Sequence, residues 1–481
     1  MSNTTADQTA QGPLDPDTVE GLGWIGIIRL GLIQTALGAI VVLTTSTLNR
    51  VMVVELGLLA ILPGALVGWH YAIQMLRPRW GYGSDVGGMR SPWIVGGMAI
   101  LAIGGALAAA ATALMAATVW GGIALALFAF TLIGVGVGAC GTSLLTLLAT
   151  AVAPRRRAAA ASTVWIMMIA GFVVTAIFAG AMLEPFSMTR LVIVASSVSA
   201  IAFAVTVFAI WGVERNALPK IEAIRAANRH ASGVIAGQQP GAAAKRPFRD
   251  VLSEVWSETQ ARRFTIFVFV SMLAYSMQDL ILEPFAGLLF NMTPAQSTQL
   301  SGTQNGGVLT GMIAVALIGS LSGGSRVGVL RLWAVCGCIA SALSLTGLAI
   351  AAHVGPAWPL QANVFALGVS NGAFAVAAIG SMMGLASAGA ERREGTRMGL
   401  WGAAQAIAFG VGGLLGAGLV DISRALFGTP VAAYSTVFAI EAVLFIASAA
   451  LAVHVGRTAQ DNSRIHAPLG GDAMLELEGQ R

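Results

Sequence analysis

Acidic residues stand inside some of the most apolar parts of this sequence. Asp279 and Glu283 are four residues apart in the stretch 264–290, so on a helix they share one face. Two neighbouring carboxylates in apolar surroundings do not both ionise readily, which suits a proton-carrying pair or a buried hydrogen-bonded network. Glu441, in the stretch 431–455, is a candidate third member. The sequence therefore predicts an acidic network and leaves open whether protons move through it.

A second candidate site is an ion pair near the end of the first apolar stretch. Arg50 and Glu55 are five residues apart, where a turn could bring guanidinium and carboxylate into a bidentate contact. Such a pair could fasten the hairpin between two helices. Alternatively, it could recognise an anionic or carbonyl-bearing group of a ligand or partner.

The elements that must position these residues are apolar stretches about one bilayer thick. A bilayer core of about 30 Å requires roughly 20 apolar residues per helix. Hydrocarbon cannot satisfy free backbone groups, so each stretch must be a helix or a barrel strand, and barrel strands are shorter and alternate in polarity. Twelve helices are predicted, at 24–48, 54–76, 92–115, 120–150, 160–183, 190–212, 264–290, 305–322, 327–352, 358–389, 398–420 and 431–455.

Composition and charge agree with an all-α integral membrane protein. Hydrophobic residues make up 56% of the chain and charged residues 10%, far below the roughly 25% that is usual in soluble domains. Lys and Arg concentrate at the two ends and in the even-numbered connections, which predicts that these segments, both termini included, are cytoplasmic. The net charge of +5 then reflects topology and attraction to anionic lipid, and not nucleic-acid binding.

The predicted helices fall into two halves of six. We expect a tail at 1–23, bundles at 24–212 and 264–455, a linker at 213–263 and a second tail at 456–481. A shift of 236 residues superposes two features near the fifth helix of each half, which indicates duplication. These are the pairs Arg156-Arg157 with Arg392-Arg393 and Trp165 with Trp401. Within the linker, an apolar spacing predicts an interfacial helix that either tethers the bundles or docks a partner, through Val251, Leu252, Val255 and Trp256.

The connection between the second and third stretches resembles the loop motif of the major facilitator superfamily. Its members here are Gly81, Asp85, Gly88 and Arg90. In that family the glycine permits close helix approach and the aspartate helps to hold one conformation. Val86 replaces the basic residue that usually follows the aspartate, so the motif indicates the fold more than transport.

Three runs near the start of the chain resemble a narrower family. They are Arg29 to Gln34, Thr47 to Leu56 and Gly68 to Tyr71, followed by Gly83-Ser84-Asp85 and Arg90-Ser91-Pro92-Trp93. Together they are similar to the PucC/LhaA family of purple phototrophic bacteria, a branch of the major facilitator fold. The resemblance is strongest over roughly 24–100, and the Asn-Arg-Val-Met-Val-Val-Glu-Leu run at 49–56 is its most specific part.

The resemblance implies a light-harvesting complex assembly factor of the bacterial inner, intracytoplasmic membrane. Its implied cargo is bacteriochlorophyll a, held transiently, and its implied partners are antenna polypeptides, with the reaction-centre complex, the insertion machinery and bacteriochlorophyll synthase as further candidates. His70 could ligate the pigment magnesium through a neutral imidazole, or simply hydrogen-bond to a neighbour. We group Arg29, Gln34 and Asn49 with His70, Arg50 and Glu55 as candidate pigment or partner contacts.

The alternative is a secondary transporter that moves a small solute, possibly coupled to protons, through a cavity lined by Asp279, Glu283 and Arg29. No pattern predicts an enzyme. The dinucleotide-like spacing at 136–141 and the nucleophile-elbow string at 368–372 both lie inside membrane stretches, not between a strand and a helix. The three cysteines are too few for a tetrahedral zinc site, so no intrinsic metal is expected.

Overall fold

A computed structural model gives the fold of the 481-residue chain. The structure describes residues 21–76, 89–153, 156–220, 256–321, 327–387 and 394–465. Within these ranges the chain is helical apart from short turns. The predicted loop residues Gly81, Asp85 and Gly88, the apolar linker residues Val251, Leu252 and Val255, and the Arg392-Arg393 pair lie outside the described residues.

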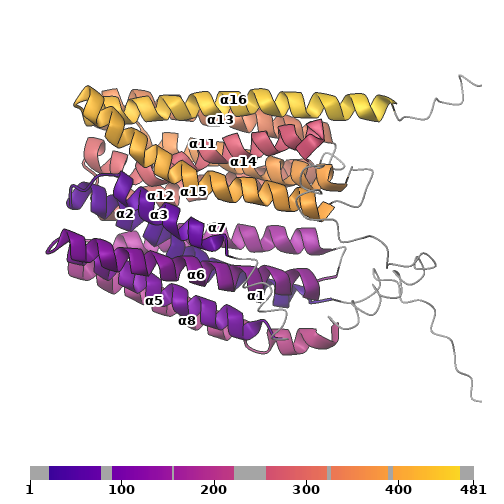
Figure 1. The fold of residues 1–481 in the computed structure, drawn as a ribbon, viewed down its shortest axis with the longest axis horizontal. Helices are drawn as coiled ribbons and strands as arrows, with labels where there is room; N and C mark the ends of the chain where they lie inside the picture. Colours follow the sequence, from indigo (N-terminus) through magenta and orange to yellow (C-terminus); the bar gives the residue numbers. More distant parts are fainter. Residues whose placement is uncertain are drawn as a thin grey trace, which may run out of the picture. The chain divides into compact units, whose positions relative to one another are not determined.

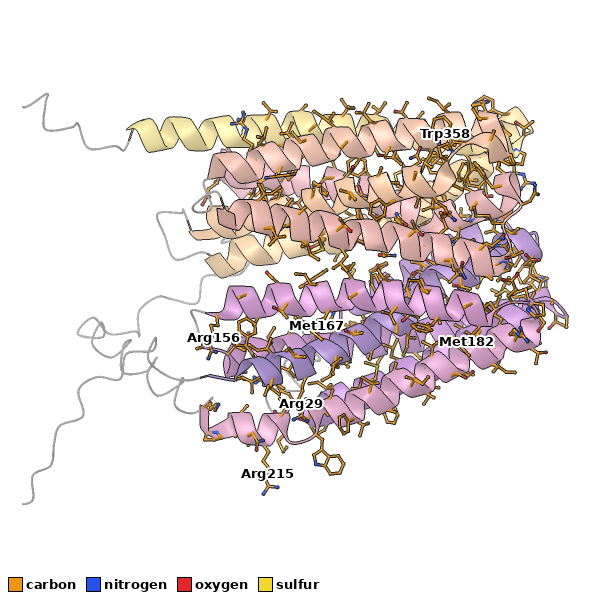
Figure 2. All side chains as sticks on the ribbon, turned by 180° about the vertical axis from the view of Figure 1, so that it is seen from behind. Arg29, Arg156, Met167, Met182, Arg215 and Trp358 are labelled. Atoms are coloured by element: carbon orange, nitrogen blue, oxygen red, sulfur yellow. The ribbon has the colours of Figure 1, made fainter. Side chains whose placement is uncertain are left out.

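Helices run side by side in each part of the chain (Figure 1). The N-terminal half contains α1 (Trp24–Val42), η1 (Leu43–Thr47), α2 (Leu48–Arg50), η2 (Val51–Glu55), α3 (Ile61–Gln74), α5 (Ser91–Met115), α6 (Val119–Ala151), α7 (Arg157–Met182) and α8 (Met188–Ile210). The C-terminal half contains α11 (Thr259–Phe290), α12 (Pro294–Leu321), α13 (Val327–Val354), η4 (Gly355–Ala357), α14 (Leu360–Ser387), α15 (Glu394–Phe427) and α16 (Pro430–Ile465). Arg156 and Met182 mark the two ends of α7 in Figure 2.

The chain divides into two compact units. Unit 1 holds residues 1–48 and 69–246, and unit 2 holds residues 49–68 and 247–481. Within unit 1, α1 packs on α7 and α8, and α5 packs on α6 and α8. Within unit 2, α11 packs on α15 and α16, and α13 packs on α14 and α16. The same pattern of neighbours, first with fifth and sixth and third with fourth and sixth, therefore occurs in both halves, as expected for a duplicated six-helix bundle.

Glycine sets the closest helix contact in unit 2. Gly307 and Gly311 of α12 face Gly368 and Gly372 of α14, and a Cβ at any of the four would lie on a backbone carbonyl oxygen of the other helix. Small residues let membrane helices approach this closely. In lipid there is no hydrophobic driving force between helices, so their association depends on such close van der Waals packing. The 368–372 string is thus a helix contact and not a catalytic turn.

The first two helices begin and end differently from the prediction. The predicted connection after residue 48 is helical, because the π-helical segments η1 and η2 carry the first helix on to Glu55. The chain reverses at Leu56–Ala60, where Gly57 takes a left-handed φ of 64° that a side chain would disfavour. Arg50 consequently lies within a helix and not in a connection.

The eighth helix begins earlier than its hydropathy suggests. The prediction begins at 305, whereas α12 begins at Pro294. Thr293 and Gln296 explain the start: the backbone N–H of Thr293 donates to Gln296 Oε1 at 2.9 Å and that of Gln296 donates to Thr293 Oγ1 at 3.3 Å, which is a capping box. The polar residues of this first part are buried, namely Ser297, Thr298, Ser301 and Gln304.

Two other helix ends also differ from their predicted positions. The helix of α16 continues to Ile465, ten residues past the predicted span, and residues 213–220, assigned to the linker, are helical. Ten helices of the described chain are long and apolar enough to cross a membrane. The two remaining long elements are α3, whose described part has 14 residues, and the polar α12. With them the described helices account for all twelve predicted spans.

Candidate functional site

Arg50 and Glu55 form an ion pair in unit 2, between Arg50 Nη1 and Glu55 Oε1. In a regular α-helix, residues five apart point about 140° away from each other, because each residue turns the helix by about 100°. The hydrogen bonds of η2 instead join residues five apart, as from Leu56 N–H to the Val51 carbonyl at 3.1 Å. This wider turn brings both side chains to one face of the helix. The ion pair is therefore formed within a π-helical segment, and not across the hairpin turn that the sequence suggested.

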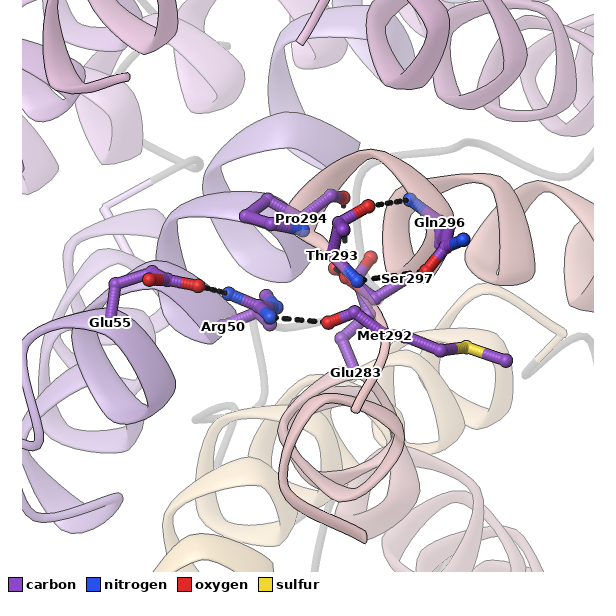
Figure 3. A network of polar contacts seen from close by, with 8 residues as sticks. All are labelled: Arg50, Glu55, Glu283, Met292, Thr293, Pro294, Gln296 and Ser297. Carbon is purple, nitrogen blue, oxygen red and sulfur yellow. Dashed lines mark hydrogen bonds and ion pairs between the residues drawn. The ribbon is translucent and has the colours of Figure 1, made fainter. Parts of the chain in front are cut away.

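The same guanidinium binds the turn between α11 and α12. Arg50 Nη2 donates to the Met292 carbonyl oxygen at 2.6 Å (Figure 3). Met292 lies between the left-handed Asn291, which ends α11, and the Thr293 capping box, which starts α12. A Cβ at Gly287 would lie 3.1 Å from Arg50 Nη2, so this glycine leaves room for the guanidinium. Arg50 is only 2% exposed, and its contacts support the fastening role more than recognition of a ligand.

Two further side chains tie residues 49–61 to helices of unit 2. Asn49, 1% exposed, donates from Nδ2 to the Leu280 carbonyl of α11. Asp421 of α15 accepts from the backbone N–H of Ala60 at 3.1 Å and of Ile61 at 2.7 Å. The Asp421 carboxylate therefore caps the start of α3, where unpaired N–H groups favour a negative charge. We call Asn49, Arg50 and Asp421 the hairpin clamp.

Replacing Asp421 tests the cap. In Asp421→Asn the amide nitrogen cannot accept a hydrogen bond, so one of the two N–H groups at the start of α3 loses its acceptor and the other keeps only a neutral one. We expect a loss of about 1 kcal/mol in stability, the usual size for a helix cap, measured by thermal unfolding of the detergent-solubilised protein. A variant as stable as the original chain would contradict this assignment.

The three acidic residues of the predicted network lie on two helices of unit 2 that pack on each other, α11 and α16. Glu283, 2% exposed, accepts from Ser297 Oγ of α12 at 3.4 Å. Asp279 is half-buried on α11, and Glu441 of α16 is 0% exposed, with no hydrogen-bond partner for either carboxyl oxygen among the described residues. Glu283 therefore joins the polar start of α12, and no hydrogen bond in the described chain joins the three acids to one another.

His70 lies in unit 1 at the contact of α3 with α6. Its ring centroid is 6.5 Å from that of Phe130 and 4.2 Å from that of Tyr71, and its side chain is 2% exposed. Because Gly134 has no side chain, α6 approaches the His70 backbone carbonyl closely. The imidazole is therefore enclosed by protein in this structure.

Two other predicted contacts have internal partners in unit 1. The guanidinium of Arg29 donates to the carbonyl oxygens at the end of α8, those of Phe208, Ala209 and Trp211, where a helix favours a cation. Gln34 donates from Nε2 to Met168 Sδ of α7 at 3.2 Å. Both side chains therefore bind neighbouring helices of the bundle in this structure.

Arg90, the described member of the loop motif, is 7% exposed. Its Nη1 donates to Thr150 Oγ1 of α6 at 2.8 Å. Glu214 accepts at 2.6 Å from the backbone N–H groups of both Arg90 and Ser91, and so caps α5. The end of the motif is therefore fixed inside unit 1.

Sequence reasoning missed Asp421 and Glu214, both of which cap helices far away in sequence. No local signal identifies such caps, because the acceptor and its N–H partners are 360 and 124 residues apart. The capping box at Thr293 could have been found, since a threonine followed three residues later by glutamine is a recognisable helix start, although a polar stretch and not an apolar run follows it here.

Solved structures share this arrangement of helices. A tetrameric PepTSo2 structure matches with a TM-score of 0.64 and 13% identity over 91% of this chain and 99% of its own. The nucleoside transporter NupG matches with a TM-score of 0.62 and 15% identity over 89% and 99%. The fold and its apolar spans define a multi-pass membrane protein of the major facilitator class, which confirms the predicted all-α fold.

A family model described as PUCC protein matches residues 47–460. The bacteriochlorophyll synthase 44.5 kDa chain of Rhodobacter capsulatus is 50% identical over 438 residues, which are 90% of this chain and 96% of that one. Protein PucC of Cereibacter sphaeroides is 30% identical over 437 residues, or 86% and 88%. The chain belongs to the PucC family, as the resemblance predicted.

Proposed function

We propose that this chain is an assembly factor for light-harvesting complexes, which binds or delivers bacteriochlorophyll a and chaperones antenna polypeptides as they insert. The family match over 47–460 carries the proposal. The name of the Rhodobacter capsulatus relative links a similar chain to bacteriochlorophyll, although the proposal assigns no catalytic step to this one.

The proposed setting is the bacterial inner, intracytoplasmic membrane, with both termini cytoplasmic. The basic residues of the ends and even connections support this orientation. Antenna polypeptides are the proposed partners, and the reaction-centre complex, the insertion machinery and bacteriochlorophyll synthase are further ones. All of them are membrane-embedded or membrane-bound, which suits a chain whose described surface is largely apolar.

Absorption spectroscopy of the gently solubilised protein tests the proposal. We expect a near-infrared bacteriochlorophyll band that co-purifies with the protein, and a deletion strain that has lost antenna absorption. If His70 ligates the pigment, His70→Leu lowers the band while His353→Leu, at an exposed histidine bonded to Ser435, does not. Pigment-free protein together with normal antenna levels in the deletion strain would refute the assembly role.

A second candidate is a secondary transporter, favoured by the buried acidic residues of α11 and α16. Such residues are costly in a membrane and often mark solute or proton paths. This candidate predicts solute uptake by vesicles that contain the pure protein, and loss of uptake in Asp279→Asn. Uptake without pigment binding would favour it over the assembly role.

A further inference from the structure

A proline interrupts the backbone hydrogen bonds of α11. Pro284 lies inside this helix, six residues before its end at Phe290. A helical carbonyl normally accepts from the backbone N–H four residues later, and proline has no N–H, so the Leu280 carbonyl oxygen lacks its usual donor. Leu280 is 2% exposed, and a buried carbonyl without a donor costs free energy. This carbonyl therefore needs a donor from another part of the protein.

Asn49 supplies that donor. Its Nδ2 donates to the Leu280 carbonyl oxygen, 231 residues away in sequence, and its side chain is 1% exposed. Both residues belong to unit 2, which includes residues 49–68. The amide N–H of asparagine has the same chemistry as the backbone N–H that proline lacks. Asn49 thus completes the hydrogen bonding of α11 at the step that Pro284 breaks.

The orientation of the Asn49 amide fits this role. Its Oδ1 has no hydrogen-bond partner in the described chain, so the one bond that fixes the side chain is the one it donates. A flipped amide would place its oxygen against the carbonyl oxygen of Leu280, and two acceptors repel each other. The Leu280 carbonyl therefore determines which way the amide points.

Arg50 contacts α11 on the other side of the proline. A Cβ at Gly287, three residues after Pro284, would lie 3.1 Å from Arg50 Nη2. The same nitrogen donates at 2.6 Å to the carbonyl oxygen of Met292, just beyond the end of the helix (Figure 3). Asn49 and Arg50 are neighbours in sequence, and they hold α11 before and after Pro284.

We propose that Pro284 is a hinge of α11 and that Asn49 is the latch that holds it in the described conformation. Proline lets a helix bend, and membrane proteins accommodate it where a neighbouring side chain binds the freed carbonyl. When Asn49 moves away, the Leu280 carbonyl loses its donor and the last turns of α11 are free to change direction. Asn49 is thus a positioning residue for the end of α11. The inference goes beyond the assembly role and does not rest on it.

A double-mutant cycle on the full-length, detergent-solubilised protein tests the latch. Asn49→Leu removes the donor at similar volume and should lower the temperature of thermal unfolding by a few degrees. Pro284→Ala restores a backbone N–H for the Leu280 carbonyl, so Asn49→Leu should lower the temperature much less in that background. An equal loss in both backgrounds would overturn the proposal, because it would show that Asn49 acts through packing alone.

Asn363 provides a matched control in the same unit. Its Nδ2 donates to the Ser344 carbonyl of α13 at 2.9 Å, and the residue four positions after Ser344 is a leucine with a normal backbone N–H. Asn363→Leu should therefore lower the unfolding temperature equally in the original chain and in Pro284→Ala. If Asn49→Leu does not fold, adding Pro284→Ala should restore folding, and failure to restore it would contradict the latch.

Hydrogen–deuterium exchange supplies a second measurement, on the hinge itself. In Asn49→Leu, or in the milder Asn49→Ala, the backbone amides of residues 285–292 should exchange several-fold faster, because the end of α11 bends at the proline. The amides of α13 should keep their exchange rates. Exchange that rises throughout unit 2, or that stays unchanged at 285–292, would refute the hinge.

Discussion

Adding one methyl group at Gly307 should destabilise the protein while the same change at Gly306 should not. In Gly307→Ala the new Cβ would lie on the Phe365 carbonyl oxygen of α14, and backbone atoms cannot rotate away as side chains can. We expect a loss of about 1–3 kcal/mol, the usual cost of overpacking, as α12 and α14 separate. Thermal unfolding of the solubilised protein, followed by size-exclusion chromatography, measures this loss.

Gly306 provides the matched control on the same helix. A Cβ there meets no atom within 4 Å, so Gly306→Ala should gain up to about 1 kcal/mol from the better helix propensity of alanine. The two neighbouring substitutions should thus have opposite signs. Equal effects would show that helix propensity, and not the contact with α14, controls stability at this position.

Removing the guanidinium of Arg50 should loosen the hairpin clamp. Arg50→Met leaves the Met292 carbonyl oxygen without its charged donor and leaves Glu55, which is 33% exposed, without its ion pair. Hydrogen bonds to charged groups contribute roughly 1.5–3 kcal/mol, and relief of the desolvation of the buried arginine offsets part of that. We expect a net loss of about 2 kcal/mol in thermal unfolding, together with faster proteolysis at residues 56–60.

Two variants separate the parts of this effect. Arg50→Lys keeps the positive charge but lacks the planar guanidinium, whose two terminal nitrogens bind Glu55 and the Met292 carbonyl at the same time. We therefore expect a loss of stability between those of the original chain and Arg50→Met. Arg215→Met removes an arginine that Figure 2 shows extending away from the ribbon, and should change stability little. If Arg50→Met and Arg215→Met behave alike, Arg50 does not fasten the turn.

Most of the fold follows from hydropathy, since the twelve stretches and their order need only the length of an apolar run. The ends of the helices do not. The eleventh predicted span ends at residue 420, just before Asp421, whereas α15 continues to Phe427. A helix can leave the apolar layer and persist when its polar groups bind another helix, as Asp421 does at the start of α3.

The candidate site was predicted in part. Spacing alone suggested that Arg50 and Glu55 could pair, and the structure contains this ion pair. The π-helical turn that joins the two residues depends on its backbone hydrogen bonds, which no residue pattern in 43–55 predicts. The four-residue spacing of Asp279 and Glu283 suggested one shared network. Glu283 instead accepts a hydrogen bond from Ser297 of α12, because helix packing decides which neighbour an acid meets.

The polar beginning of α12 bears on how the topology of such chains is mapped. Serine, threonine and glutamine side chains are buried inside unit 2 there, so the apolar stretch predicted from residue 305 is shorter than the helix, which begins at Pro294. An algorithm that skipped it would count an odd number of crossings. Every reporter fused after residue 321 would then be assigned to the opposite side of the bilayer, and a correct fusion map would look like a protein with two orientations.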